Sequence, residues 1–317
     1  MKNAKISRRS FLLGLAACSA AGILTACKGD DTPASSASTS PEAPASSVSE
    51  LEPIGLFTVE DFPKLDGSTA CIPLMAQMMA DTTGIDLEVA QSGISVSTTA
   101  YAWENFGLYP DEEYTARMLV VYEAPDYVKE ELKEANAQLE QKPIGRDALV
   151  FIVNENNPVK SLTRQQLKDI YAGKITNWKE VGGEDAKIVV YSRETSSGTY
   201  EFFKESVLHN KNYMSSILSM PATGAIIQSV RQTKGAIGYV GLAYLNPYVK
   251  AVAVSYDGGK KFVTPSIESA IRKEYPVVRP LYYYYDKANE KAVQPFLEYL
   301  DTPQAREKTL DLGFIPR

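Results

Sequence analysis

Residues 190–200 read VYSRETSSGTY, the end of an expected strand followed by a turn rich in hydroxyl groups. The apolar, β-branched run over residues 187–191 predicts a buried strand. Apolar residues recur at helical spacing over residues 201–208, so a helix is expected directly after the turn. This strand–turn–helix unit is the centre from which the rest of the chain can be interpreted.

The turn has the chemistry of an anion site. Ser197 or Thr199 is a natural N-cap, and Gly198 lets a ligand approach the backbone closely. The first amides of the helix have no intrahelical acceptor and the helix dipole is positive there, so the turn can hold an anion. Arg193 adds a planar set of donors that suits a tetrahedral oxyanion. An ordinary turn whose hydroxyls only cap the helix is an equal alternative at this point.

The first 26 residues are expected to be an export signal, not part of the fold. Four basic residues precede an apolar run that is too short to span a bilayer. The segment SRRSFL at residues 7–12 is similar to a twin-arginine signal. The segment LTAC ending at Cys27 resembles a bacterial lipobox, in which the cysteine is lipidated. We therefore expect anchoring through Cys27 on the extracytoplasmic face of the cell membrane.

Composition limits the partners and cofactors. Residues 27–51 are rich in Ser, Ala, Pro and Thr, which predicts a disordered tether. Without the four basic residues of the signal, the chain carries 29 basic and 39 acidic residues, a formal charge of −10. Such an acidic body argues against nucleic acid as a partner. Cys71 is the one cysteine left after Cys18 and Cys27, so no intramolecular disulfide is expected, and we expect Cys71 to be a buried apolar residue.

Two further segments resemble the central turn in chemistry. Residues 65–70 read LDGSTA before a helical run, a second glycine–hydroxyl helix start. Residues 92–99 read SGISVSTT and are either a third contributor or a solvated loop that caps a helix. Strands that alternate with helices indicate an α/β layout with mainly parallel sheets, in which ligands bind at the carboxyl ends of strands.

Several motifs together resemble a known family. They are IYAGKITNW at 170–178, VGG at 181–183, Arg193 with SGT at 197–199, and GAIGYV at 235–240. The combination is similar to the phosphate-binding lipoproteins of bacterial phosphate ABC importers, over roughly residues 65–285. The resemblance implies a periplasmic-binding-protein-like fold of type II. Its two lobes would each have a mainly parallel sheet flanked by helices, with a hinge between them.

The resemblance also implies a division of the chain and a set of ligand-binding residues. Residues 52–150 would form the first part of lobe 1, residues 151–250 lobe 2, and residues 251–317 the return to lobe 1. The implied binding residues are Ser68, Thr69, Ala70, Thr98, Thr99, Glu123, Arg193, Thr195, Ser197, Gly198 and Thr199.

Two of these positions depart from the family pattern. Thr195 and Glu123 stand where the family carries aspartates. A carboxylate in such a site accepts a hydrogen bond from protonated phosphate and repels sulfate, whereas a threonine hydroxyl can also donate and discriminates less. Glu123 is therefore expected to be the proton acceptor, unless it is an exposed carboxylate with no such role. Arg146 and Asp147 are expected to form an ion pair at the hinge, or Arg146 faces the cleft.

The function implied is capture of inorganic phosphate between two lobes and delivery to the permease and ATPase subunits of an ABC importer. We expect a monomer with no cofactor and no metal. The alternatives are a receptor for sulfate, molybdate or a small organic phosphate, or a surface sensor without transport. An enzyme is disfavoured because Ser196 and Ser197 lack a nearby base, and the sole histidine, His209, lies at the far end of the next helix.

Overall fold

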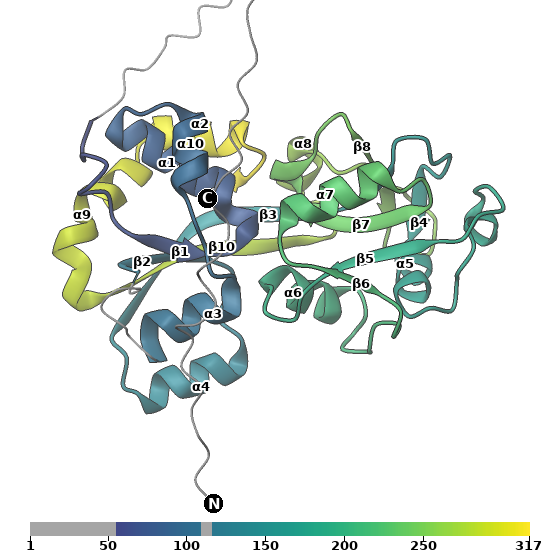
Figure 1. Cartoon of the computed structure of the whole chain (residues 1–317), viewed down its shortest axis with the longest axis horizontal. Helices are drawn as coiled ribbons and strands as arrows, with labels where there is room; N and C mark the ends of the chain where they lie inside the picture. Colours follow the sequence, from purple (N-terminus) through teal and green to yellow (C-terminus); the bar gives the residue numbers. More distant parts are fainter. Residues whose placement is uncertain (1–54, 109–115) are drawn as a thin grey trace, which may run out of the picture. The chain divides into compact units, whose positions relative to one another are not determined.

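The computed structural model describes residues 55–108 and 116–317 (Figure 1). The expected signal, the Cys27 anchor and the whole tether lie outside the described residues.

The first lobe is built from segments near both ends of the described chain. Its strands are β1 (Leu65–Gly67), β2 (Met118–Val121), the first half of β3 (Leu139–Asn154), β10 (Val278–Asp286) and β11 (Ile315–Pro316). Its helices are η2 (Thr69–Cys71), α1 (Ile72–Thr83), α2 (Leu87–Gly93), α3 (Thr99–Trp103), η3 (Glu104–Leu108), α4 (Asp126–Glu134), η6 (Lys287–Asn289), α9 (Glu290–Leu300) and α10 (Pro303–Asp311).

The second lobe is built from one continuous stretch. Its strands are the second half of β3, β4 (Ser161–Thr163), β5 (Val189–Arg193), β6 (Leu218–Met220), β7 (Ala236–Gly241), β8 (Val249–Ala251) and β9 (Ala253–Ser255). Its helices are α5 (Arg164–Tyr171), η4 (Trp178–Val181), α6 (Gly198–Ser206), α7 (Thr223–Gln232), η5 (Leu242–Tyr244) and α8 (Ile267–Ile271).

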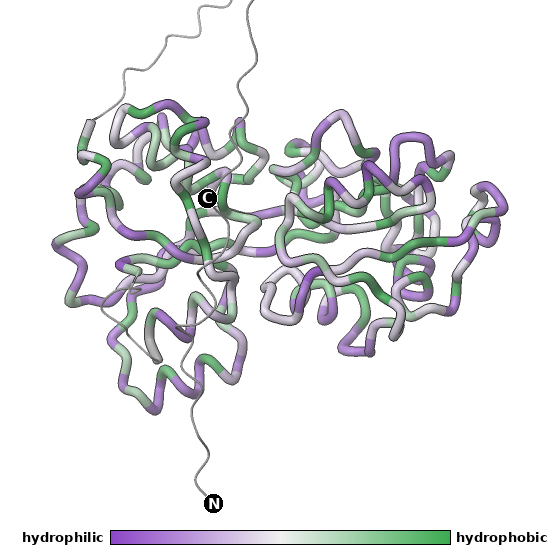
Figure 2. Tube along the Cα trace, in the orientation of Figure 1, coloured by the Kyte–Doolittle hydropathy of each residue, from purple (hydrophilic) through white to green (hydrophobic). Residues whose placement is uncertain are grey.

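The alternation of side chains along the strands sorts each lobe into two core layers. In β2, Met118 and Val120 pack with residues of α1 and α9, whereas Leu119 and Val121 pack with residues of α3 and α4. Figure 1 shows these two pairs of helices on opposite sides of the strands. The tyrosines of β10 alternate in the same way, as their spacing predicts. In Figure 2 the strands at the centre of the second lobe are mostly hydrophobic and the outer loops mostly hydrophilic.

The strand β3 belongs to both lobes. The sheet order is β1-β2-β10-β3-β7-β5-β6, with β8 and β11 also paired to β3. The first half of β3 pairs antiparallel with β10, and its second half pairs antiparallel with β7. Ile144 lies in the core of the first lobe and Leu149 in that of the second, so the chain crosses between the lobes over these few residues. The α/β class and the two lobes are confirmed.

Two details differ from expectation. The sheet is mixed, because β3 and β10 run antiparallel to their neighbours, whereas β1–β2, β5–β6 and β5–β7 are parallel. The return to the first lobe also comes later than residue 251. Val252, Val254 and Tyr275 lie in the core of the second lobe, because β9 pairs with β4, and the return is made by β10.

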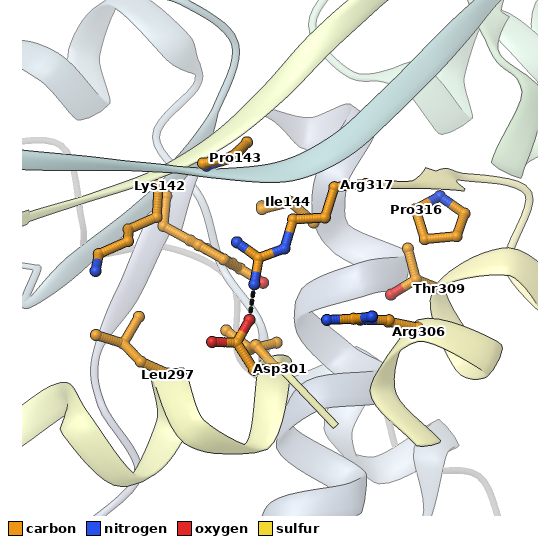
Figure 3. A pocket seen from close by; sticks show the side chains of 11 residues that line it. Lys142, Pro143, Ile144, Leu297, Asp301, Arg306, Thr309, Pro316 and Arg317 are labelled. Atoms are coloured by element: carbon orange, nitrogen blue, oxygen red, sulfur yellow. Dashed lines mark ion pairs between the residues drawn. The ribbon is translucent and has the colours of Figure 1, made fainter. Parts of the chain in front are cut away.

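Local signals in the sequence match the structure well. Thr163 and Gln166 form the expected capping box at the start of α5. Thr302 caps α10, with Pro303 in its first turn and Gly313 beyond its end at a φ of +91°. After it, β11 pairs with β3, and the Arg317 guanidinium forms an ion pair with Asp301 (Figure 3). The pocket beside this ion pair holds only about 50 Å³.

Candidate functional site

The site centres on Arg193, the last residue of β5. Its side chain is only 1% exposed. Nη1 donates to the hydroxyls of Thr69 (2.8 Å) and Thr223 (3.0 Å), while Nε and Nη2 donate to the carbonyls of Met220 and Pro221. Burial lowers the pKa of Arg193, yet an arginine remains protonated in proteins. No ion pair joins this guanidinium to a carboxylate of the described residues, so its positive charge is left without an anionic partner.

The turn after β5 places the start of α6 beside the first lobe. Ser197 caps α6, and its Oγ accepts from the Thr199 amide at 3.2 Å, as expected. Gly198 permits a close approach, because a Cβ there would lie 2.8 Å from the Oγ1 of Thr99. The Ala100 amide donates to the Ser196 carbonyl at 3.0 Å, which ties the two loops together. The start of α6 therefore lies directly against Thr99 of the other lobe.

The first lobe contributes two loops to the site, one at Ser68 and Thr69 and one at residues 97–99. Ser68 caps η2, its Oγ accepting from the Ala70 amide at 3.3 Å, and Thr69 accepts a hydrogen bond from Arg193. Thr98 has a φ of +82°, an uncommon conformation for a β-branched residue. The hydroxyls of Thr98 and Thr99 are both buried and have no hydrogen-bond partner. Buried polar groups without a partner are costly, and a ligand that accepts from them would remove that cost.

Sequence reasoning missed Asp66, which holds the second of these loops. Its Oδ1 accepts from the amides of Gly67 (2.6 Å) and Ser97 (2.7 Å), and its Oδ2 accepts from the Ser97 hydroxyl. The side chain is 9% exposed. A signal was present, because Asp66 directly precedes the glycine–hydroxyl motif, but its partner comes 31 residues later.

Sequence reasoning also missed Arg279 on β10. Its Nη2 lies 2.8 Å from Asp147 Oδ2 and 3.0 Å from the Thr199 hydroxyl, and its Nη1 donates to the Gly198 carbonyl at 3.3 Å. Tyr122 donates its hydroxyl to the same Asp147 oxygen at 2.9 Å, and the guanidinium lies over the Tyr122 ring. Burial raises the pKa of Tyr122 well above its ordinary value, so the phenol remains a donor. Arg279 thus joins the hinge of the first lobe to the binding turn of the second.

The expected pair of Arg146 with Asp147 is not formed. Adjacent residues of a strand point to opposite faces of the sheet, so the two side chains diverge. Asp147 is fully buried and pairs with Arg279 instead. Arg146 is partly exposed and makes no ion pair with a described residue.

The two positions that depart from the family pattern lie apart from the buried donors. The side chain of Glu123 is 56% exposed and pairs with Lys129 at 2.8 Å. It lines the cleft that also contains Thr99, Gly198 and Arg279. Thr195 is exposed at the tip of the turn. The other expected residues come together at one place between the lobes: Ser68, Thr69, Ala70, Thr98, Thr99, Arg193, Ser197, Gly198 and Thr199.

Among the residues that the structure describes, no group of three or more His, Cys, Asp or Glu side chains is arranged to hold a metal ion. Within the same residues, no helix is both long and apolar enough to cross a membrane.

Two α/β lobes that share the strand β3, with buried hydrogen-bond donors from both lobes at their junction, have the architecture of two-lobed binding proteins. The chain belongs to the family described as the PBP superfamily domain, whose model matches residues 66–303.

Individual relatives agree with this family. The chain is 32% identical over 190 residues to the phosphate-binding protein PstS of Pseudomonas aeruginosa, covering 55% of this chain and 59% of that protein. It is 34% identical over 202 residues to PstS of Staphylococcus epidermidis, covering 60% of each. The chain thus spans somewhat more than half the length of the curated relatives it matches.

A solved structure gives a wider match. It is a Clostridium perfringens protein with bound phosphate, described as the substrate-binding protein of a phosphate ABC transporter. The TM-score is 0.66 at 29% identity, covering 80% of this chain and 98% of the other.

Proposed function

We propose that this protein is an extracytoplasmic receptor that binds inorganic phosphate between its two lobes and delivers it to an ABC import permease. One observation carries the proposal: Arg193 is 1% exposed and has no carboxylate partner among the described residues. An isolated buried charge is strongly unfavourable unless a counter-charge joins it. An anion bound beside Arg193 supplies that counter-charge.

The groups around Arg193 suit a tetrahedral oxyanion. The hydroxyls of Thr98 and Thr99 are unpaired donors, and the helix starts at Ser68 and Ser197 present free amides. Arg279 adds a second guanidinium, although its charge is already balanced by Asp147. Donors that come from both lobes can bind one anion together, so binding favours the closed arrangement.

A specific observation keeps sulfate or molybdate as the second candidate. Protonated phosphate needs an acceptor in its site. Asp147 accepts from Arg279 and Tyr122 through Oδ2, and its buried Oδ1 is left without a partner. Asp66 accepts from Ser97 and Gly67, and Glu123 is half exposed and paired with Lys129. A site with few free acceptors discriminates weakly against a fully deprotonated anion.

Calorimetric titration of the protein with phosphate, sulfate and molybdate at fixed pH and ionic strength tests the proposal. Phosphate should bind at least tenfold more tightly than sulfate, a difference of about 1.4 kcal/mol. Tighter binding of sulfate would move the assignment to the second candidate. Binding of none of the three would remove the oxyanion site altogether. A phosphatase assay with and without divalent metal checks the expectation that the protein is not an enzyme.

We further propose that Cys27 carries the lipid anchor and that the protein acts as a monomer. The LTAC segment supports the anchor, and the Ser/Pro/Ala-rich stretch after it would separate the anchor from the lobes. Palmitate labelling of cells that express wild type and Cys27→Ala tests this. The variant should lose the label and leave the membrane fraction, with its phosphate affinity unchanged. A labelled Cys27→Ala protein would show that the lipid is attached elsewhere.

A further inference from the structure

A cleft beside the anion donors is larger than a tetrahedral oxyanion requires. It has a volume of about 480 Å³ and is lined by residues of both lobes. Thr99, Gly198 and Arg279 of the anion site form part of its wall. Clefts of this size are typical of sites for small organic ligands. The Thr99 hydroxyl, in a side chain only 2% exposed, has no partner and lines this space.

One face of α6 runs from the anion site along the cleft. Gly198, Glu201, Phe202 and Glu205 follow the helical spacing of one face, and all four line the cleft. With a rise of ~1.5 Å per residue, Glu201 lies about 4.5 Å and Glu205 about 10.5 Å along the axis from Gly198. The two carboxylates therefore lie at increasing distance from the anion donors along the helix.

The charges on the two sides of the cleft are not equivalent. On the first lobe, Glu123 and Asp126 are both paired with Lys129. On the second lobe, Glu201 and Glu205 are exposed and form no ion pair with any residue of the described ranges. A bare dianion gains nothing from two unneutralised carboxylates near its site, because they repel it. A group that carries positive charge at that distance is attracted by them.

We propose that the cleft accepts a zwitterionic phospho-compound: a phosphate or phosphonate head at Thr99 and the start of α6, with a short tail that ends in an ammonium group at Glu201 and Glu205. The inference rests on the proposed function, because it uses the same anion site for the head. Phe202 and Tyr122 supply apolar surface beside the tail. The ammonium group neutralises the acidic face that inorganic phosphate leaves unused.

The test compares four probes on the full chain by calorimetry. Inorganic phosphate reports the anion site alone, and glycerol 3-phosphate adds a tail without positive charge. Phosphoethanolamine and 2-aminoethylphosphonate add the ammonium group on an ester and on a phosphonate head, and so separate the two sources of the head. We expect at least one ammonium probe to bind about tenfold more tightly than glycerol 3-phosphate at low salt. The preference should shrink as ionic strength rises, because Glu201 and Glu205 are exposed and salt screens their charges.

Two variants locate the effect. The double variant Glu201→Gln/Glu205→Gln should abolish the preference for the ammonium probes and leave inorganic phosphate as tight or tighter. Glu307→Gln, an exposed acid of α10 outside the cleft, is the matched control and should retain the preference. Melting temperatures measured without ligand check that all variants are folded.

The outcomes separate this inference from the proposed function. If phosphate binds and the ammonium probes bind no better than glycerol 3-phosphate, the inference is overturned and the phosphate receptor stands. A preference that persists in the double variant overturns the role of Glu201 and Glu205. If no probe binds, both the inference and the proposed function are wrong.

Discussion

Two buried arginines approach the same turn, and they differ in how their charge is balanced. Arg279, on β10, is paired with Asp147 and lies over the ring of Tyr122. The guanidinium of Arg193, at the end of β5, has hydroxyls and carbonyls as its hydrogen-bond partners and no carboxylate among the described residues. A buried charge with a good partner is already neutralised in the protein without ligand. A buried charge without a partner is neutralised only when an ion of opposite charge binds beside it. Arg279 is thus a structural arginine, and Arg193 is the arginine that we propose to bind the anion.

The largest expected effect is on stability, when Arg279 loses its partner. Asp147→Ala leaves Arg279 buried and uncompensated, so the free energy of unfolding should fall by about 3–5 kcal/mol. Chemical denaturation measures it. The matched control is Asp185→Ala, because Asp185 pairs with Lys179 at an exposed position and its loss should leave stability nearly unchanged. A similar loss in both variants would show that the Asp147 pair is not special.

On the binding side, Arg193→Ala should cost about 2–5 kcal/mol of phosphate binding, the range for a desolvated charge pair. Calorimetry measures the affinity directly. Phosphate should also raise the melting temperature of wild type and not that of the variant, because only a bound ligand stabilises the fold. An affinity within twofold of wild type would make Arg193 structural, and the contrast with Arg279 would disappear.

A smaller effect is expected where the two lobes touch. Gly198→Ala places a Cβ 2.8 Å from the Thr99 hydroxyl, so the loop of the first lobe must move away. The turn itself should tolerate alanine, since Gly198 starts a helix and is not among the glycines with a positive φ. We expect phosphate affinity to fall about tenfold, or 1.4 kcal/mol, with little change in unfolding free energy. Gly224→Ala is the control, because a Cβ there meets nothing within 4 Å.

The smallest effect concerns discrimination between anions. Glu123→Gln should lower the affinity for phosphate relative to sulfate by up to about fivefold, because water screens a half-exposed carboxylate. Thr195→Asp adds an acceptor that sulfate cannot satisfy and should shift the ratio the other way. Titration of both variants with both anions gives the ratios. No change in Glu123→Gln would leave Glu123 as a partner of Lys129 only.

The parts of the site that sequence reasoning found are those encoded locally. Ser197 caps the helix that follows it, just as Thr163 caps α5 in a capping box with Gln166 three residues later, so each feature lies within one turn. Arg279 lies 132 residues from Asp147, and no pattern within a segment shows that they meet. The pairing of Arg146 with Asp147 was predicted from adjacency and is wrong, since a strand separates adjacent side chains. The motifs of the family resemblance did not include Asp66 or Arg279 as binding residues.

The mixed sheet also depends on which distant segments pair, and local sequence does not show this. Apolar runs predict strands but do not fix their direction, so the antiparallel course of β3 and β10 could not be predicted from composition. Burial of Cys71 was predicted correctly, because a lone cysteine in an apolar run packs as a small hydrophobic residue. Burial also raises the pKa of the Cys71 thiol, which makes it a poor nucleophile in the folded protein.

The sharing of β3 between the lobes has a consequence for the order in which the chain folds during synthesis. The second lobe takes its strands from one continuous stretch, so its core residues, apart from Ile315, are available once Val277 has been made. In the first lobe, β10 lies between β2 and β3, and the sheet stays incomplete until the last 40 residues of the chain are present. Contacts between distant segments form slowly. The proposed anion site takes residues from both lobes, so it can form only after the sheet of the first lobe is complete.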